Sequence, residues 1–357
     1  MVSAPGVAGS CAAAVDIGST SVHLLVGCVG SGVSVGCVGS VASVGSLDGV
    51  ASLGGVVPLD GVGSLSSGGD GRVEPLLDTS ELLGLGGRIQ ADGMLGVEGR
   101  RLLAATLARQ AAAARALGVE HIVFAGTDPL RHAADAARAC HEIEQATGVA
   151  VHVLDQDEEG ALTLLGVTAG RPISGGLAVV DIGGGSTEII VTGAGGIRQV
   201  IGLPVGASRL TVGTGAGDPP SAADMATLRA EARRVLRAAP DVTLGEVVAV
   251  GGTAYGLSKI VAGPGGLERV IDLDGLRRAM AIIAAESSQD IAETFRMNPR
   301  RTRILAAGGA IVEALLERYG IEHIQASQAS LREGLVLVLV RDGVAWRDRL
   351  RALVATR

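Results

Sequence analysis

Short runs of aliphatic residues alternate along the chain with longer stretches in which apolar residues recur at helical spacing. The pattern predicts one helix over 97–118 and a second over 130–147. Each is followed by a short apolar run, 120–126 or 150–155, of the kind that forms a buried strand. Regular alternation of strand and helix indicates an α/β fold.

The same alternation continues through the second half of the chain. Strands are expected near 187–202 and at 246–252 and 323–327, and helices at 221–238, 253–261, 274–288, 300–318 and 331–340. This order fits two mixed sheets flanked by helices, and a length of 357 residues favours about two domains. We expect an N-terminal domain over 1–156 and a second domain over 157–357, with the C-terminal helix a candidate to pack back on the first.

One segment follows neither pattern. Between Val35 and Leu65 an apolar residue occupies every third position, with mostly Gly, Ser, Ala or Asp between. A period of three fits neither helix nor strand, and the glycine content favours a flexible coil over a polyproline II helix. We interpret residues 34–71 as a low-complexity insert without chemistry. Because it follows the second strand of a hairpin, we expect it to project away from the hairpin turn.

Two stretches of the chain repeat one pattern. AVDIGSTSVHLLVG (14–27) and VVDIGGGSTEIIVTG (179–193) both consist of an apolar strand, Asp-Ile-Gly, a small hydroxylated turn and a second apolar strand. We expect the later turn to be one residue longer. The repeat predicts two related halves whose hairpins face each other.

The two hairpin turns are candidate phosphate sites. Glycine lets a ligand approach the backbone N–H groups closely, and Ser and Thr add hydroxyl donors. The candidate phosphate-binding residues are Gly18, Ser19, Thr20, Gly183, Gly184, Gly185, Ser186 and Thr187. Asp16 and Asp181, at the strand ends, are candidate ligands of a divalent cation, since Mg²⁺ prefers oxygen ligands and keeps much of its water. For either turn alone, an ordinary hairpin is the alternative interpretation.

An acidic cluster lies where a strand passes into a helix. Its members are Asp155, Asp157, Glu158 and Glu159, within VLDQDEEGALTLLG (153–166). Acids at a helix N-terminus complement the helix dipole, so capping is one interpretation. The other is that one carboxylate acts as the general base for an attacking water.

Two further motifs are candidate anion sites. GTDPLR (126–131) places Arg131 just inside a helix, where its guanidinium can bind phosphate; a solvated surface arginine is the alternative. VGGTAYG (250–256) is a third glycine-rich turn, and its Gly252 and Thr253 would lie at a helix N-terminus, which favours an anion.

Composition narrows the possible partners. A net charge of -7 with scattered positive residues argues against binding a nucleic-acid backbone, and 1% aromatic residues argues against base stacking. Residues 24–47 are uncharged but rich in Gly and Ser, so we expect no membrane span; the first ten residues lack the features of a signal peptide. The four cysteines form no CxxC pair, so we expect neither zinc nor a disulfide, but reduced thiols in a cytoplasmic protein.

Six stretches, in this order, resemble the exopolyphosphatase and guanosine pentaphosphate phosphatase family. They are AVDIGSTSVHLLVG, GTDPLR, VLDQDEEGALTLLGV, VVDIGGGSTEII, VGGTAYGLSKI and ASLREGLVLVL. The resemblance covers nearly the whole chain except the insert. It implies two ribonuclease-H-like domains of the actin-like ATPase superfamily around a central cleft. It also implies Mg²⁺-dependent removal of terminal phosphate from polyphosphate or from guanosine pentaphosphate, and a homodimer.

The resemblance also implies roles for individual residues. The two catalytic carboxylates fall on Glu159 and Glu188. Asp16 and Asp181 match the phosphate-loop and metal positions, and Arg131 matches the phosphate-binding arginine.

The chain departs from the family pattern in three places. Gln156 replaces a glycine that usually precedes the acids, and Arg303 stands where an acid is expected. The chain also resembles a short form without the C-terminal helical extension of longer members. His23 is expected to support the core or the loop rather than to bind a metal.

These observations favour a hydrolase that releases terminal phosphate from inorganic polyphosphate. A guanosine pentaphosphate phosphohydrolase, a kinase of the same architecture and a non-catalytic sensor of these anions stay open as alternatives. The acidic cluster argues against the sensor, because binding alone needs no general base.

Overall fold

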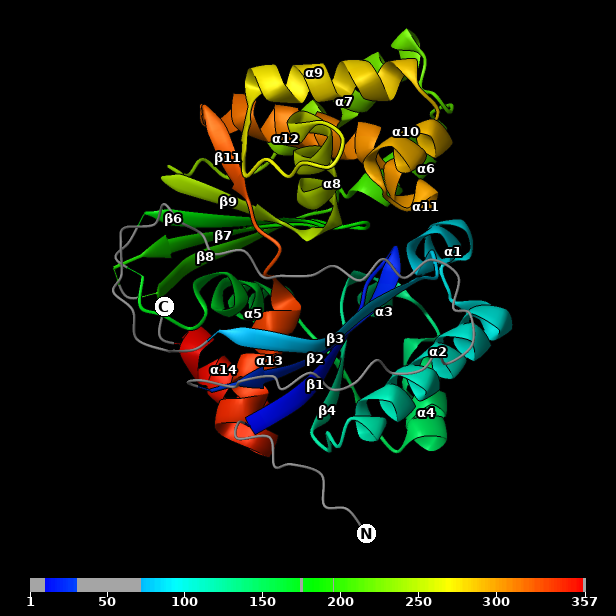
Figure 1. Ribbon diagram of the computed structural model, residues 1–357, viewed down its shortest axis with the longest axis vertical. Helices are drawn as coiled ribbons and strands as arrows, with labels where there is room; N and C mark the ends of the chain where they lie inside the picture. Colours follow the sequence, from blue (N-terminus) through cyan, green and yellow to red (C-terminus); the bar gives the residue numbers. More distant parts are fainter. Residues whose placement is uncertain (1–9, 31–71, 174–175, 195, 356–357) are drawn as a thin grey trace.

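The computed structural model describes residues 10–30, 72–173, 176–194 and 196–355. These residues form two α/β units, one above the other in Figure 1. The insert expected at 34–71 lies outside the described residues. A membrane-spanning helix, which needs about 20 predominantly apolar residues, is not found in the described ranges.

The first sheet has five strands in the order β3-β2-β1-β4-β5. Their bounds are β1 (Ser10–Ile17), β2 (Ser21–Val29), β3 (Val73–Leu82), β4 (Ile122–Gly126) and β5 (Val151–Val153). The first three strands are antiparallel neighbours, and β4 and β5 run parallel to β1. Alternate side chains of β1 enter two different apolar clusters, which explains why this strand is apolar on both faces.

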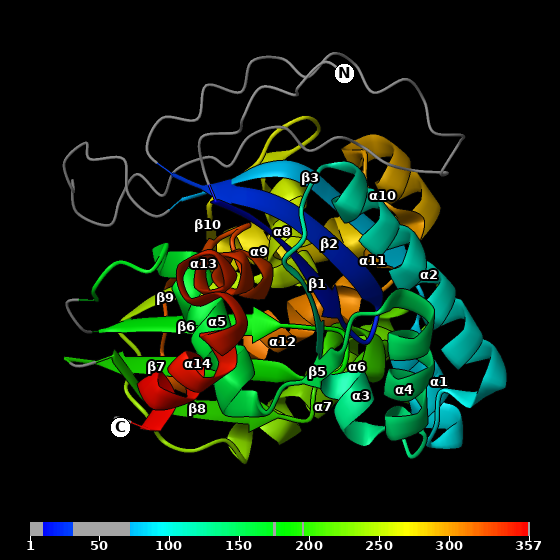
Figure 2. The same ribbon diagram turned by 90° about the horizontal axis from the view of Figure 1, so that it is seen from below.

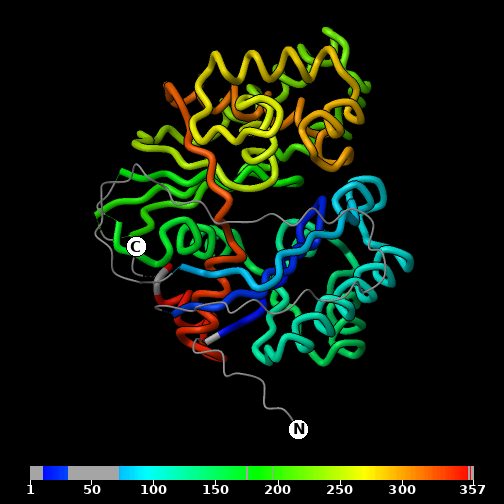
Figure 3. Tube along the Cα trace, viewed as in Figure 1, coloured from blue at the N-terminus to red at the C-terminus, as the bar shows by residue number. Residues whose placement is uncertain are grey.

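Helices cover both faces of this sheet. They are α1 (Leu85–Asp92), α2 (Gly96–Ala116), α3 (Asp128–His132), α4 (Ala136–Thr147), α13 (Leu331–Asp342), the short 3₁₀ helix η1 (Gly343–Ala345) and α14 (Trp346–Ala355). The helices α2 and α4 pack with one face of β1 and β2. The opposite face packs against α13, which comes from the end of the chain. Figure 3 shows the C-terminal segment returning from the upper unit to the lower one.

The second sheet repeats the strand order of the first. Its strands are β6 (Leu177–Ile182), β7 (Thr187–Gly193), β8 (Gly196–Leu203), β9 (Glu246–Val250), β10 (Val270–Asp272) and β11 (His323–Ala326). The order β8-β7-β6-β9-β11 matches β3-β2-β1-β4-β5, with β10 added at the edge. The predicted pair of ribonuclease-H-like halves is therefore confirmed.

The second sheet is also covered on both faces. One face carries α6 (Ala207–Thr214), α7 (Ala222–Arg237), α8 (Gly251–Ala262), α9 (Leu273–Ala285), α10 (Ser288–Phe295), α11 (Pro299–Thr302) and α12 (Leu305–Tyr319). The other face packs against α5 (Gln156–Thr168). The helices α5, α13 and α14 lie side by side between the two sheets in both views (Figure 1 and Figure 2).

The helices α5 and α13 cross at two bare glycines. A side chain at Gly166 would collide with the backbone carbonyl of Ser330, and one at Gly334 would collide with that of Leu162. The two backbones therefore touch, as small residues allow. Since α5 packs on the second sheet and α13 on the first, this crossing joins the two units.

Several expected elements differ in the structure. The helix expected over 130–147 is two helices, because Ala133 is extended and ends α3. The helix expected over 300–318 is likewise divided, into α11 and α12. The sequence pattern also missed β3, α1, α6, β10, α10 and α14. These elements are short, edge-located or partly exposed, so their periodicity is weak.

The two hairpins are equal in length at the turn. Asp16 lies opposite His23, and Asp181 lies opposite Glu188. In each turn a glycine N–H donates to a serine carbonyl three residues on: Gly18 to Ser21 and Gly183 to Ser186. The expectation of a longer second turn was wrong. The one additional residue of the second repeat lies at the end of β7 that is farther from the turn.

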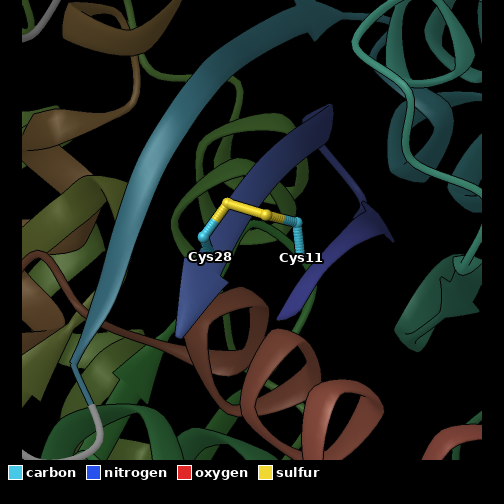
Figure 4. Close-up of a disulfide and its surroundings, with 2 residues drawn as sticks. All are labelled: Cys11 and Cys28. Carbon is cyan, nitrogen blue, oxygen red and sulfur yellow. A yellow bond between two sulfur atoms is a disulfide. The ribbon is translucent and has the colours of Figure 1, made fainter. Parts of the chain in front are cut away.

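Two of the four cysteines form a disulfide, which corrects the expectation of reduced thiols. Cys11 in β1 is bonded to Cys28 in β2 (Figure 4). The pair is 17 residues apart in sequence but directly opposite in the antiparallel register, with Cα atoms 4.0 Å apart. A search for CxxC spacing cannot detect such a cross-strand pair. Cys140 is free and half-buried, and Cys37 lies outside the described residues.

Candidate active site

The turns of the two hairpins touch each other between the units. Gly184 faces the side chain of Thr20, and Gly185 faces Ser19 and Asp128, so that neither glycine has room for a Cβ. Residues 184 and 185 must therefore be glycines, because any side chain there would collide with the first turn or with Asp128. The contact brings together the residues that follow β1, β4 and β6.

The acidic cluster divides into capping residues and a centre-facing residue. Asp155 caps α5 by accepting from the N–H of Glu158 at 2.8 Å, and the Glu158 carboxylate accepts from the N–H of Asp155 at 3.1 Å. The capping interpretation therefore holds for these two residues. The next residue, Glu159, is buried, and its carboxylate faces Arg131.

Arg131 lies between two buried carboxylates. Its Nη1 is 2.5 Å from Glu159 Oε2, and it also donates to the carbonyl of Leu154 at 3.1 Å. Its Nη2 is 3.9 Å from Glu188 Oε1, too far for a hydrogen bond. The side chains of Glu159 and Glu188 are only 9% and 2% exposed, so both acids are screened little by water.

Asp16 and Asp181 occupy equivalent places at the ends of β1 and β6. Burial, and then the negative charge of Glu159, raise the pKa of each to about 7, with Asp181 adding to the effect on Asp16. Burial, followed by Glu159 and Asp181, raises the pKa of Glu188 well above its usual range. Burial raises the pKa of Glu159 as well, although Arg131 opposes this. The site therefore concentrates more negative charge than one arginine offsets.

Several polar atoms of the site have no partner among the described residues. Buried atoms without a hydrogen bond include Asp16 Oδ1, Thr20 Oγ1, Arg131 Nη2 and Glu188 Oε1. Buried donors and acceptors that stay unpaired are costly, so they indicate a site for a polar ligand or water.

The donor set fits a magnesium ion held jointly with a substrate. Within the described ranges, no three acidic, His or Cys side chains are arranged to enclose a metal ion by themselves. Mg²⁺ is usually held by one or two carboxylates together with phosphate oxygens and water, so a protein-only cage is not required. The unpartnered Oδ1 of Asp16 and the carboxylate of Asp181 are oxygen ligands of the right type.

Some predicted phosphate ligands have other partners here. The Thr187 hydroxyl donates to the Val205 carbonyl at 2.6 Å, and Ser19 Oγ donates to Asp128 at 2.8 Å. Thr253 packs against Gly308 in α12. Ser186 hydrogen-bonds to Glu188, which favours the charged form of that acid.

The third glycine-rich turn lies beside Asp181. Gly251, with φ of 86°, begins α8 directly after β9, and its Cα faces Asp181 Oδ1. Gly252 faces the guanidinium of Arg301. Only glycine adopts this left-handed backbone without strain, which explains why residue 251, directly before Gly252 and Thr253, is a glycine.

Arg301 and Arg332 are site residues that the sequence did not reveal. Arg301 donates to Ser80 Oγ at 2.7 Å and to His23 Nε2 at 3.1 Å, and no carboxylate in the described ranges forms an ion pair with it. Burial, and then the charge of Arg332, lower its pKa. Arg332 pairs with Asp78 at 2.5 Å and lies close enough to Asp16 to favour that acid's charged form. Arg332 lies within the quoted stretch ASLREGLVLVL, which assigned it no role, and no quoted motif contains Arg301.

His23 supports the first turn, as expected. Its Nε2 lies 2.6 Å from Ser21 Oγ. Burial, and then the charges of Arg332 and Arg301, lower its pKa well below the usual value, so the ring is neutral and can accept from Arg301. It occupies in β2 the place that Glu188 occupies in β7.

The two unusual residues of the sequence have structural partners. Gln156 lies against Gly202 in β8 and leaves the Glu159–Arg131 pair in place. Arg303 donates to the carbonyl of Ala216 and lies 4.0 Å from Asp218. Arg303 therefore holds the segment before α7 instead of an anion.

Two ribonuclease-H-like units with facing acidic hairpins define the class: this is an α/β protein with the actin-like ATPase fold. The sequence profile of the Ppx/GppA phosphatase family matches residues 65–342. The chain belongs to that family, and it is a phosphoanhydride hydrolase.

Curated relatives come from both branches of the family. The chain is 29% identical over 289 residues to Exopolyphosphatase 1 of Mycobacterium tuberculosis, covering 75% of this chain and 81% of that protein. It is also 29% identical over 232 residues to the guanosine-5'-triphosphate,3'-diphosphate pyrophosphatase of Vibrio cholerae. That second alignment covers 62% of this chain and 46% of the relative.

Solved structures confirm the fold. An exopolyphosphatase from Cytophaga hutchinsonii aligns with a TM-score of 0.72 at 19% identity, covering 93% of this chain and 98% of that one. The Aquifex aeolicus member of the Ppx/GppA family aligns with a TM-score of 0.68 at 22% identity, covering 94% and 99%.

Proposed function

We propose that this protein releases the terminal phosphate of inorganic polyphosphate by attack of water. The observation that carries the proposal is the Glu159–Arg131 pair, buried among three further acids where the two hairpin turns meet. Exopolyphosphatase 1 of Mycobacterium tuberculosis, similar over most of its length, supports the choice of substrate.

Glu159 is the general base in this mechanism. A water oxygen attacks the terminal phosphorus while its proton passes to the Glu159 carboxylate. The bond from that phosphorus to the bridging oxygen breaks, and the bridging oxygen leaves on the shortened chain. Phosphoryl transfer needs mainly positioning and charge neutralisation, so one well-placed base is sufficient. Glu188 orients the same water. Arg131 Nη2, which has no hydrogen-bond partner among the described residues, donates to a phosphate oxygen and offsets its negative charge.

Magnesium is part of the proposal. Asp16 and Asp181 would hold Mg²⁺, which when bound neutralises phosphate oxygens. Asp16 and Asp181 lie at the C-terminal ends of β1 and β6, so both carboxylates are beside the turns that carry Ser19 and Ser186. We also propose a homodimer, which rests on the family resemblance alone. The cytoplasmic location stays a proposal from the sequence, and the Cys11–Cys28 disulfide removes the support that it took from reduced thiols.

Guanosine pentaphosphate is the second candidate substrate. The similarity to the Vibrio cholerae pyrophosphatase supports it. Its phosphates would meet the same turns and the same Glu159, so the catalytic centre does not discriminate between the two substrates. A sensor without catalysis would bind either anion and release no phosphate.

The test is release of inorganic phosphate by the purified protein with Mg²⁺, comparing polyphosphate with guanosine pentaphosphate. We expect rapid release from polyphosphate. Glu159→Gln should lower turnover by about 100-fold or more and leave polyphosphate binding near the wild-type value, because it removes the base and keeps the side-chain shape. Asp157→Asn, two residues away in the same cluster, is the matched control and should keep its rate within about twofold.

Each other outcome selects a different function. Faster release from guanosine pentaphosphate would assign the second substrate. Binding of either anion without release would assign the sensor. A Glu159→Gln variant with wild-type turnover would place the base elsewhere.

A further inference from the structure

A cavity of about 240 Å³ lies beside the two hairpin turns, on the side formed by α1, α3 and α6. Its lining includes Ile89 and Gln90 of α1, Asp128 and His132 of α3, and Ser208 and Arg209 of α6. The glycines of the second turn, 184 and 185, also line it. The cavity therefore shares a wall with the candidate active site, although Glu159, Glu188, Asp16 and Asp181 do not line it.

The short helix α3 separates the cavity from the catalytic acids. Arg131 points to Glu159, whereas Asp128 and His132 of the same helix line the cavity. The charge of Asp128 nevertheless acts on both Glu159 and Arg131, raising the pKa of each. Asp128 is thus close enough to the candidate active site to act on it electrostatically.

An ion pair between the two units closes this wall. Arg209 Nη2 lies 3.1 Å and 3.2 Å from the two oxygens of Asp128, and its Nε donates to the carbonyl of Gly185 at 2.6 Å. Ser19 donates to the same carboxylate at 2.8 Å. Asp128 is therefore contacted from both units, by Ser19 and His132 of the first and by Arg209 of the second, with His132 Nδ1 at 3.2 Å from Oδ1. The Arg209 side chain is 37% exposed, so its guanidinium borders water, whereas its partner Asp128 is only 9% exposed.

The proposed reaction requires an exit for the phosphate product that differs from the path by which the substrate enters. After cleavage, the shortened chain occupies the path by which the substrate entered, and the phosphate lies at its inner end. That phosphate also faces four buried carboxyl groups, and like charges repel strongly where water is scarce. The hairpin turns are in contact at Gly184 and Thr20, so their own junction leaves no passage.

We propose that the cavity is the exit for the phosphate product and that the Arg209–Asp128 pair is its gate. This inference rests on the proposed function. Arg209 exchanges the Asp128 carboxylate for the departing phosphate, because a guanidinium binds either anion through two parallel N–H groups. Ser208 and Gln90 add polar groups along the cavity. A chain could then lose one phosphate after another without dissociating.

The first test obstructs the cavity and measures cleavage and release separately in the Mg²⁺-loaded protein with polyphosphate. Ile89→Trp fills the cavity. We expect single-turnover chain shortening within about twofold of wild type, but steady-state release slower by about tenfold. Acid-quenched samples should then show a burst of one phosphate per active site, whereas a free-phosphate sensor should show none. Val212→Trp adds the same side chain on the exposed side of α6 and should match the wild type.

Two polar variants test the gate without filling space. Gln90→Glu keeps its size and adds a negative charge, so release should slow by about threefold or more, and added salt should relieve the effect. Arg209→Ala removes the group that escorts phosphate. Product inhibition by inorganic phosphate should weaken by about tenfold. Arg229→Ala breaks an ion pair with Glu313 on α12, away from the cavity, and is the matched control.

The outcomes separate this inference from the function on which it rests. If wild-type protein fails to shorten polyphosphate in a single turnover, the proposed function is wrong. If chains are shortened normally but Ile89→Trp, Gln90→Glu and Arg209→Ala all release phosphate as the wild type does, with unchanged product inhibition, the exit lies elsewhere.

Discussion

Buried like charges dominate the candidate site at the scale of single residues. Asp16, Glu159, Asp181 and Glu188 lie close together, and burial raises the pKa of each acid. An acid whose pKa is higher in the folded state takes up protons on folding, so its ionisation at higher pH destabilises the fold. Stability is given up at this site so that a base and a cation site can exist at neutral pH.

Asp181→Asn should therefore make the metal-free protein more stable. The folded pKa of about 7 exceeds the usual 3.8, so the folded state binds more protons between those values, and the free energy of unfolding falls as pH rises through that window. In EDTA at pH 8 we expect a gain of about 1–2 kcal/mol. The gain should shrink as the pH falls towards 4, because Asp181 is then protonated in the folded state and begins to be protonated in the unfolded state as well. Thermal or urea unfolding at the two pH values measures this.

A surface acid provides the comparison for that measurement. Asp274 is 74% exposed and pairs only with Arg277 one turn away, so Asp274→Asn should change stability by less than about 0.5 kcal/mol at either pH. Equal stability of Asp181→Asn and wild type at pH 8 would mean that Asp181 is not destabilising in the folded protein.

At the scale of elements, the C-terminal helix holds the helix that carries the base. Glu158, with a side chain only 2% exposed, accepts two hydrogen bonds from Arg347 at 2.8 Å and 2.7 Å, and one from Arg351 at 2.8 Å. Trp346 packs edge-on against His152. The helix α14 thus holds the first turn of α5 through Glu158. The next residue, Glu159, faces Arg131 in the candidate active site.

Arg347→Ala should consequently lower kcat by about tenfold and leave KM unchanged, because Glu159 loses its fixed orientation while the phosphate turns stay intact. Loss of one partner of a buried carboxylate should also cost about 1–2 kcal/mol of stability, since Arg351 still compensates part of the charge. Arg349, which is 72% exposed and lies 3.5 Å from Asp342, is the control on the same helix. A destabilised Arg347→Ala variant with wild-type kcat would make α14 a structural support only.

At the scale of the whole molecule, the two units meet through few elements. The hairpin turns, the Arg209–Asp128 pair and the α5–α13 crossing at Gly166 and Gly334 join them. The insert is attached away from the hairpin turns. Its flanking residues, Val29 and Val73, pair at the end of β2 opposite to the turn at Gly18.

Joining Val33 to Arg72 should therefore leave the rate of phosphate release within about twofold of wild type. The deletion leaves a loop of five residues, Gly30 to Val33 and Arg72, between paired strands, and this is an ordinary hairpin length. Phosphate release by the two purified proteins, matched for folded content by circular dichroism, is the measurement. A folded deletion without activity would place the insert in catalysis.

The sequence by itself determined the local features of this protein. Strand and helix periods, the Asp-Ile-Gly repeat and the acids at the start of α5 depend on neighbouring residues. They predicted the two-sheet fold and the candidate carboxylates. The capping interpretation of the acidic cluster is confirmed for Asp155 and Glu158. Glu159 faces the centre, and its role as the base stays a prediction.

Only the tertiary structure decided which distant residues meet. Ser19 and Asp128 are 109 positions apart and Arg209 and Asp128 are 81 apart, so no local pattern records their contact. The Cys11–Cys28 bond and the place of Arg301 beside His23 likewise follow from register and domain packing. Periodicity records the face of an element that is buried, but a contact between elements depends on how two surfaces fit, and that is settled only when the whole chain packs.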